Sequence, residues 1–314
     1  MNINDICVIG GGGFVGRHLV HQLAARGLRV RVAARDRERV KDLILLPTVD
    51  VVYADVHDPA ALAGVISGAG AVVNLVGVLH DGRGTASFAQ AHVGLTHKIL
   101  AACEAQGVTR YLHMSALGAD RSGPSRYQQT KGEAEDLVRA SKLDWTIFRP
   151  SVIFGPGDRF LNLFAKLQAL TPLVFLARPQ ARFQPVHVED VAAVLVSALC
   201  DRSSVWECFD LCGPRVYTLR ELVALAGRLG GHPRPIIGLG DGLSYLQALV
   251  LEHLPFKLMS RDNLASMQVD NVSAAPFPFG LRPAAIEAVA PLWFGTATPR
   301  GRYGGFRRSA RRPT

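Results

Sequence analysis

The sequence predicts an α/β fold in which helices cover both faces of a doubly wound parallel sheet. The first observation is that short apolar runs alternate with helix-length amphipathic stretches through the first 151 residues. The second is a run of four glycines between the first apolar run and the first helical stretch. Strands that are joined by helix-length segments need crossover connections, and these give a parallel sheet.

The expected strands and helices alternate in a regular order. We expect strands at residues 5–10, 29–34, 49–56, 71–77, 110–115 and 145–151. We expect the intervening helices at residues 14–26, 36–44, 58–68, 86–106 and 125–141. Ligands of such sheets bind beyond the carboxyl ends of the strands, so the functional residues are sought there.

The glycine run has the spacing G-x-x-G-x-x-G at Gly10, Gly13 and Gly16. Glycines allow a tight turn, close approach of a pyrophosphate and close packing of helix on strand, and the helix N-terminus attracts the phosphates. A plain glycine-rich loop is the alternative, but the position between strand and helix favours dinucleotide binding. The residues that we expect to contact a dinucleotide here are Gly10, Gly12, Gly13, Phe14, Val15, Gly16 and Arg17.

The ends of the next strands supply further expected cofactor contacts. Arg35 ends the second strand and suits a 2′-phosphate, which favours NADP(H), whereas Asp36 keeps NAD(H) open. An acid at the end of the third strand can accept a hydrogen bond from the adenine, and an apolar wall with a glycine can face the ribose. The remaining expected contacts are Asp55, Val56, Leu75, Val76, Gly77, Lys131, Pro150 and Ile153.

The candidate catalytic residues follow the fifth strand. Tyr127 and Lys131 are four residues apart, so they share one face of the predicted helix. A lysine there can hold ribose hydroxyls, and its charge favours ionisation of the tyrosine, which can then exchange a proton at a carbonyl. Ser115, at the end of the fifth strand, is a candidate hydrogen-bond donor to that carbonyl.

Composition and charge limit the classes of protein to which the chain can belong. The chain has 314 residues, 48% hydrophobic and 19% charged, with a net charge of +9. Six of the positive charges are arginines beyond residue 299, which leaves nine minus six, or +3, for the rest.

No apolar run reaches the roughly 18 residues of a membrane span, and the first strand begins too early for a signal peptide. We therefore expect a cytoplasmic protein or one peripheral to the cytoplasmic membrane face. Cys208 and Cys212 lack a second pair at ligand spacing, so we expect reduced thiols and no metal.

The second half of the chain has a different organisation. We expect domain boundaries at 1–151 for the dinucleotide-binding core, 152–298 for a segment that completes the sheet and forms a small substrate lobe, and 299–314 for a disordered basic tail. A helix is expected at 218–229, where Thr218 and Glu221 have capping-box spacing. His187 beside Asp190 fits a hydrogen-bonded strand histidine better than a hydrolase triad, since the chain has no G-x-S-x-G serine.

These motifs resemble the extended or atypical short-chain dehydrogenase/reductase superfamily. The stretches 73–79, 115–120, 125–135, 148–163 and 185–191 resemble, more narrowly, the branch that contains the nucleotide-binding accessory subunit of respiratory complex I and its bacterial relatives. The resemblance implies a Rossmann domain with a C-terminal substrate lobe, bound NADP(H) and an arginine at the position of Arg35. It also implies a catalytic Ser or Thr just past Ser115, where this chain has Ala116 and Leu117.

Two functions follow from these observations. The first is an NADP(H)-dependent oxidoreductase, or an epimerase or dehydratase that uses transient hydride transfer, acting on an unidentified small carbonyl or hydroxyl compound. The second is a nucleotide-loaded accessory or assembly protein of a respiratory-type complex. The basic tail suits a protein partner or a membrane surface, nucleic acid is disfavoured because no stacking motif accompanies it, and helices of such sheets often form homodimers.

Overall fold

The computed structural model describes residues 3–253 and 259–294, which divide into two compact units. The first unit comprises the described residues up to Ser151 together with Val188–Leu211 and Ser273–Arg282. The second comprises Val152–His187, Cys212–Val272 and the described residues from Pro283 onwards. The chain therefore leaves the first unit at residue 151 and returns to it twice.

The first unit is built on a seven-stranded parallel sheet with the strand order β11-β6-β5-β4-β1-β2-β3. Its strands are β1 (Asp5–Ile9), β2 (Arg29–Ala34), β3 (Val49–Tyr53), β4 (Ala71–Asn74), β5 (Arg110–Met114), β6 (Asp144–Pro150) and β11 (Glu207–Leu211). The order reverses between β1 and β4, the position at which ligands of doubly wound sheets bind. The predicted fold class is confirmed.

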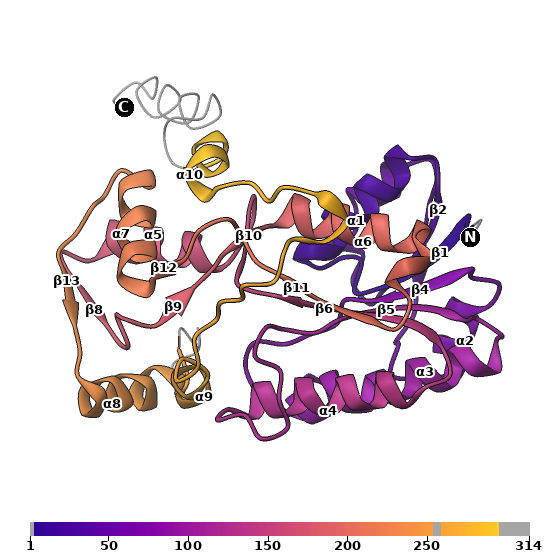
Figure 1. Ribbon diagram of the computed structural model, residues 1–314, viewed down its shortest axis with the longest axis horizontal. Coiled ribbons are helices and arrows are strands. Elements are labelled where there is room, and N and C mark those ends of the chain that lie inside the picture. The colour runs from indigo at the N-terminus through magenta and orange to yellow at the C-terminus, as the bar shows by residue number, and fades with distance from the viewer. Residues whose placement is uncertain (1–2, 254–258, 295–314) are drawn as a thin grey trace, which may run out of the picture. The chain divides into compact units, whose positions relative to one another are not determined.

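Helices cover both faces of this sheet (Figure 1). One face carries α2 (Pro59–Ile66), α3 (Leu95–Ala105) and α4 (Arg126–Ala140), and the other carries α1 (Phe14–Ala25) and α6 (Val188–Cys200). The central strands are buried along their length, β4 and β5 completely. Parallel strands that are buried along their length in this way require that both faces of the sheet are covered.

The prediction of a helix over residues 36–44 is wrong. The structure has two short 3₁₀ turns there, Arg37–Arg39 and Leu43–Leu45. The Asp36 carboxylate accepts the Glu38 N–H at 2.9 Å, which closes a tight turn in place of a helical one. The expected helix over 86–106 is also modified, because a π-helical segment, Ala89–Gly94, precedes α3.

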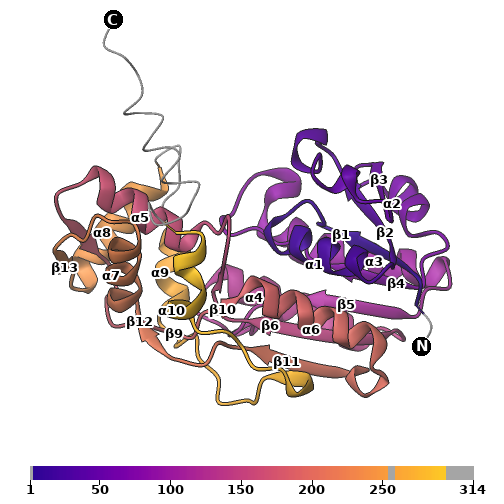
Figure 2. The same cartoon turned by 90° about the horizontal axis from the view of Figure 1, so that it is seen from above.

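The second unit has its own apolar core around α5 (Phe160–Leu170) and α7 (Leu219–Leu229), which pack against each other (Figure 2). Thr218 and Glu221 form the predicted capping box of α7. Short strand pairs connect the helices: β7 (Ile153–Phe154) with β10 (Val186–His187), β8 (Val174–Leu176) with β13 (Ile236–Gly238), and β9 (Arg182–Phe183) with β12 (Tyr217–Thr218). The other helices are α8 (Asp241–Glu252), α9 (Arg261–Ser266) and α10 (Ile286–Val289).

Within the described part of the chain, every helix is too short or too polar to cross a membrane. The predicted basic tail at residues 299–314 lies outside the described residues.

The turn between β1 and α1 depends on glycine at two positions. Gly10 has a φ of +89°, a conformation that side chains with a Cβ rarely adopt. Gly16 lies inside α1, where a Cβ would be 2.3 Å from the Gly10 carbonyl oxygen and 2.6 Å from the Gly11 Cα. These are backbone contacts that cannot rotate away, so the helix packs against the turn only when residue 16 has no side chain.

We therefore expect Gly16→Ala to lower the free energy of unfolding by about 1–3 kcal/mol or more through overpacking. Gly64 is the matched control because it is an exposed α2 residue with nothing within 4 Å of its would-be Cβ. Gly64→Ala should stabilise the protein by about 0.5–1 kcal/mol. Denaturant unfolding of both variants measures the difference, and equal effects would contradict the tight packing at Gly16.

Candidate nucleotide-binding and catalytic site

The N-terminus of α1 has the properties of an anion site. Gly13 is its N-cap residue and is exposed, and glycine has no side chain that could accept the first helical N–H groups. The first turn contains no acidic residue. Free N–H groups and the positive end of the helix dipole together favour a bound phosphate. The expected contacts from Gly10 to Gly16 surround this helix start, so the residues present fit the pyrophosphate of a dinucleotide.

The end of β2 holds the groups that would distinguish two dinucleotides. Arg35 is exposed, and within the described part of the chain it makes no hydrogen bond or ion pair. Asp36 accepts the Glu38 N–H and lies 3.6 Å from Arg39, so its carboxylate is already used in the turn. Arg17 donates to the Arg39 carbonyl oxygen. Arg35 is therefore a cation at this strand end whose donors are available to a ligand.

The segments after β3 and β4 are held by side chains that accept backbone N–H groups. Asp55 accepts the N–H of His57 at 3.1 Å, which fixes the turn that contains Val56. Asn74 is buried and accepts the N–H of Val76 at 3.1 Å. The adjoining Gly77 is exposed. The backbone beyond these two strands is thus fixed while its outer surface stays open.

Tyr127 and Lys131 lie on α4, which begins at Ser125, whose hydroxyl accepts the Gln128 N–H at 3.1 Å. Lys131 is almost fully buried, and its Nζ donates to the carbonyl oxygen of Met114 at 3.0 Å. A Cβ added to Gly77 would lie 3.3 Å from the same Nζ. The structure therefore places the lysine between the ends of β4 and β5, beside the segment expected to face the ribose.

His92 joins the segment after β4 to α4. Its Nε2 accepts the N–H of Val78 at 3.2 Å, so the ring proton is on Nδ1, which faces the Thr130 hydroxyl at 3.0 Å. The ring also meets the edge of the Tyr127 ring, with centroids 5.5 Å apart, and stacks on Phe88. These contacts fix the tyrosine ring relative to the segment that contains Gly77.

Burial and positive charge shape the protonation of this region. Burial lowers the pKa of Lys131 to about 8, although Glu135 opposes the shift. Burial, together with the charge of Lys131, also lowers the pKa of His92 to about 2 and that of His113 to about 3. Both histidines are therefore neutral at physiological pH, and the ammonium group of Lys131 is the cation in their midst.

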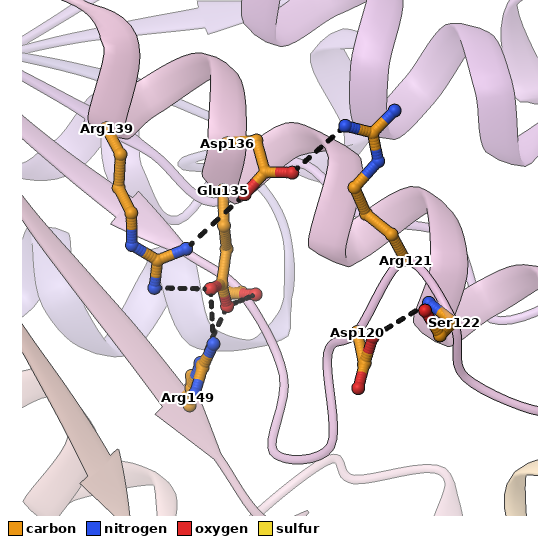
Figure 3. Close-up of polar contacts among 8 residues, drawn as sticks. Asp120, Arg121, Ser122, Glu135, Asp136, Arg139 and Arg149 are labelled. Atoms are coloured by element: carbon orange, nitrogen blue, oxygen red, sulfur yellow. Dashed lines mark hydrogen bonds and ion pairs between the residues drawn. The ribbon is translucent and has the colours of Figure 1, made fainter.

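Ser115 is buried, and its hydroxyl donates to the Glu135 carboxylate at 2.6 Å. Glu135 also accepts from Arg139 and Arg149, which point towards it from α4 and β6 (Figure 3). The same view shows Arg121 paired with Asp136 on the outer side of α4. The predicted carbonyl donor is thus engaged within the protein. Its catalytic role stays a prediction.

The last two expected cofactor contacts fall in different units. Pro150 is buried at the end of β6 in the first unit, and Ile153 is partly buried in β7 of the second. The structure places Tyr127 and Lys131 on one face of α4 and joins Ser115 to the same helix through Glu135. It places the glycine turn, Arg35 and the expected contacts that follow β3 and β4 at the carboxyl ends of the strands of one sheet, and Ile153 outside that sheet.

A model of the family described as NAD(P)H-binding matches residues 10–202, well over half of the chain. The chain belongs to the NAD(P)H-binding family. This assignment agrees with the bare helix N-terminus and the fixed strand ends described above. The protein therefore binds a nicotinamide nucleotide, and the matched residues include all of the candidate catalytic ones.

Known members and structural neighbours fall into several functional groups. A mitochondrial NADH dehydrogenase [ubiquinone] 1 alpha subcomplex subunit 9 from Arabidopsis thaliana is 37% identical over 69% of this chain, which spans 56% of that protein. A ceramide reductase from Caulobacter vibrioides is 34% identical over 78% of this chain and 77% of its own length. A dTDP-glucose 4,6-dehydratase from Streptomyces venezuelae, solved with NAD, superposes with a TM-score of 0.65 at 22% identity over 76% of this chain and 85% of its own. The structural likeness concerns the fold alone.

Two residues of this NAD(P)H-binding site were missed from the sequence. His92 lies in a stretch predicted as an ordinary helix, and no motif marks it. Glu135 follows Lys131 by the same four residues that separate Lys131 from Tyr127, so its place on the helix face was visible in the spacing. An acid on a helix ordinarily faces solvent, however, and the sequence gives no sign of its complete burial.

Because His92 and His113 are neutral in the folded protein, we expect the free energy of unfolding to decrease in acid. Because the folded pKa values of His92 and His113 are below that of a free imidazole, this stability is present above about pH 6.5 and decreases as pH falls towards about 3. At pH 5 we expect each histidine to cost about 1–2 kcal/mol relative to pH 7.5.

Denaturant unfolding of the wild type and of His92→Asn at several pH values tests this expectation. The variant should take up about one proton fewer on unfolding, which gives a shallower fall of stability below pH 6.5. His97, on the exposed side of α3, is the control position. An identical slope in the wild type and His92→Asn would contradict the neutral, buried state of His92.

Proposed function

We propose that this protein is an NADP(H)-dependent oxidoreductase that reduces a carbonyl group. One observation carries the proposal: Tyr127 shares a helix face with buried Lys131, whose Nζ lies at the ends of β4 and β5. A tyrosine beside a buried ammonium group is suited to give up a proton, because the positive charge stabilises the phenolate that remains.

Each residue of the site has a separate role in the proposed reaction. Bound NADPH would supply the hydride to the carbonyl carbon. Tyr127 donates its phenolic proton to the carbonyl oxygen as negative charge develops there, and Lys131 holds the ribose hydroxyls and stabilises the tyrosinate. His92 keeps the tyrosine ring oriented through its contacts with Val78 and Thr130. The product is an alcohol, and the tyrosine regains its proton from solvent.

The comparison with named relatives bears on the kind of substrate. The relative named ceramide reductase matches over more than three quarters of both chains, which favours reduction over epimerisation or dehydration. We therefore propose a substrate whose carbonyl is borne by an amide-containing, long-chain molecule. The epimerase and dehydratase alternatives rest on structural neighbours at low identity.

One observation favours a second function. Ser115 donates its hydroxyl proton to Glu135, and Ala116 and Leu117 follow it where the resemblance implies a catalytic hydroxyl. A site that lacks one carbonyl donor loses about two to three orders of magnitude in rate. A nucleotide-loaded accessory protein, like the relatives named as NADH dehydrogenase subunits, is therefore the second candidate.

The removal of one hydroxyl tests the enzymatic proposal. We expect the wild type to oxidise NADPH in the presence of the ketone that corresponds to a short-chain ceramide, and Tyr127→Phe to be slower by about 10²–10⁴-fold. Stopped-flow absorbance of the reduced nicotinamide measures the rate, with NADPH binding checked by fluorescence. If both proteins bind NADPH and neither consumes it with this ketone or with simpler ketones, the accessory function is favoured.

The choice of nucleotide is tested at Arg35. We expect Arg35→Ser to weaken NADPH binding by about 10–100-fold, the contribution of charge-assisted hydrogen bonds to a phosphate, and to leave NADH binding nearly unchanged. Arg29→Ser is the matched control because Arg29 is an exposed arginine at the opposite end of the same strand. Titration of protein fluorescence gives both dissociation constants. Equal losses for the two nucleotides would contradict a 2′-phosphate contact.

A further inference from the structure

Glu135 extends the functional face of α4 by one more turn. Tyr127, Lys131 and Glu135 are spaced by four residues, which puts them in one stripe along the helix. Glu135 is 0% exposed, whereas its neighbour Asp136 faces the solvent side of the helix. A fully buried carboxylate is rare in proteins unless it is paired, so its partners indicate what it does.

The partners of Glu135 come from three elements. Arg149 on β6 donates to both carboxylate oxygens, from Nε at 2.8 Å and from a terminal nitrogen at 2.5 Å. Arg139, one turn further along α4, donates at 2.8 Å. Ser115, at the end of β5, donates its hydroxyl at 2.6 Å. The carboxylate of Glu135 is thus paired with two cations and one hydroxyl, and a carboxylate can only accept hydrogen bonds.

The charged groups around Lys131 show the second role of this carboxylate. On α4 the lysine faces Tyr127 and Glu135, and across from the helix it faces His92 and His113. Both histidines are neutral, so they add no further positive charge beside the ammonium group, and an imidazole in either protonation state has no negative charge to offset it. Glu135 is the group whose negative charge raises the pKa of Lys131 against the effect of burial, which brings it to about 8. From β11, Cys208 and Asp210 face Arg149 on the far side of the cluster.

We propose that Glu135 is a positioning residue of the active site: from the same face of α4 as Lys131 its carboxylate offsets the charge of the lysine, and its hydrogen bond holds the Ser115 hydroxyl away from the substrate. Lys131 must carry its charge to bind ribose hydroxyls and to stabilise the tyrosinate. Glu135 supplies the compensating negative charge from one helical turn away, without contact with substrate or nucleotide. The inference rests on the proposed function in that Lys131 is taken to hold the nucleotide ribose.

The same geometry assigns a passive role to Ser115. Because a carboxylate has no proton to give, the proton in the bond between Ser115 and Glu135 comes from the serine. That proton is not available to a substrate carbonyl while Glu135 is charged. The carbonyl oxygen would then be met by Tyr127 and not by Ser115, and residues 116 and 117 have no hydroxyl to replace it.

The experiment measures the pH dependence of NADPH affinity, which reports the pKa of Lys131 in the free protein. In the wild type we expect affinity to decrease as pH rises through about 8. In Glu135→Gln the midpoint should move about one to two pH units lower, because the opposite charge that favours the ammonium form is gone. Asp136→Asn is the matched control: it removes an acid from the next position of α4, on the solvent side, and should leave the midpoint in place.

Two further variants make each outcome decisive. Lys131→Met should abolish the pH dependence, which assigns the midpoint to the lysine. If Glu135→Gln does not fold because Arg149 is left unpaired, Glu135→Gln combined with Arg149→Gln removes both partners. Because loss of the Arg149 charge acts on Lys131 in the opposite sense, the midpoint of the double variant is compared with that of Arg149→Gln alone and should lie lower. NADPH binding with an unmoved midpoint in the folded variant overturns the inference and leaves the proposed cofactor in place. No NADPH binding by the wild type overturns both.

Discussion

A buried carboxylate on α4 fixes the helix that carries the site to the ends of two strands. Glu135 takes hydrogen bonds from Arg149 on β6 and from Ser115 after β5, while Lys131 on the same helix face bonds to the carbonyl of Met114. Removal of one partner from such a buried pair typically costs about 3–5 kcal/mol, because a charge is left without compensation. The position of Tyr127 therefore depends on charge pairing inside the protein as well as on apolar packing.

Burial also determines which groups of the site carry charge. Removal from water lowers the pKa values of His92, His113 and Lys131, and it leaves one ammonium group as the dominant positive charge near the tyrosine. In a region of low dielectric that charge acts strongly on a phenolic proton. The arrangement suits proton transfer beside a nicotinamide ring. It suits stable retention of a nucleotide equally well, which is why a catalytic and an accessory function share one geometry.

Much of this architecture could be predicted from the sequence, and the failures have physical reasons. The sheet was predictable because short apolar runs alternate with helix-length stretches along the first half of the chain. The nucleotide turn was predictable because only glycine fits at Gly10 and Gly16. The helix expected at 36–44 failed because the Asp36 side chain closes a shorter turn. The hydrogen bond from Ser115 to Glu135 could not be predicted. Glu135 is twenty residues further along the chain, and its position in the sequence does not show whether it faces solvent or the core.

The most direct test of the account is a crystal structure of the protein with NADPH. The account predicts phosphates at the N-terminus of α1, the 2′-phosphate at Arg35, and ribose hydroxyls within hydrogen-bond distance of the Lys131 Nζ. Ser115 should still donate to Glu135 in that complex. A nucleotide bound with its nicotinamide ribose away from Lys131, or with Ser115 turned from Glu135 towards the nicotinamide, would contradict it.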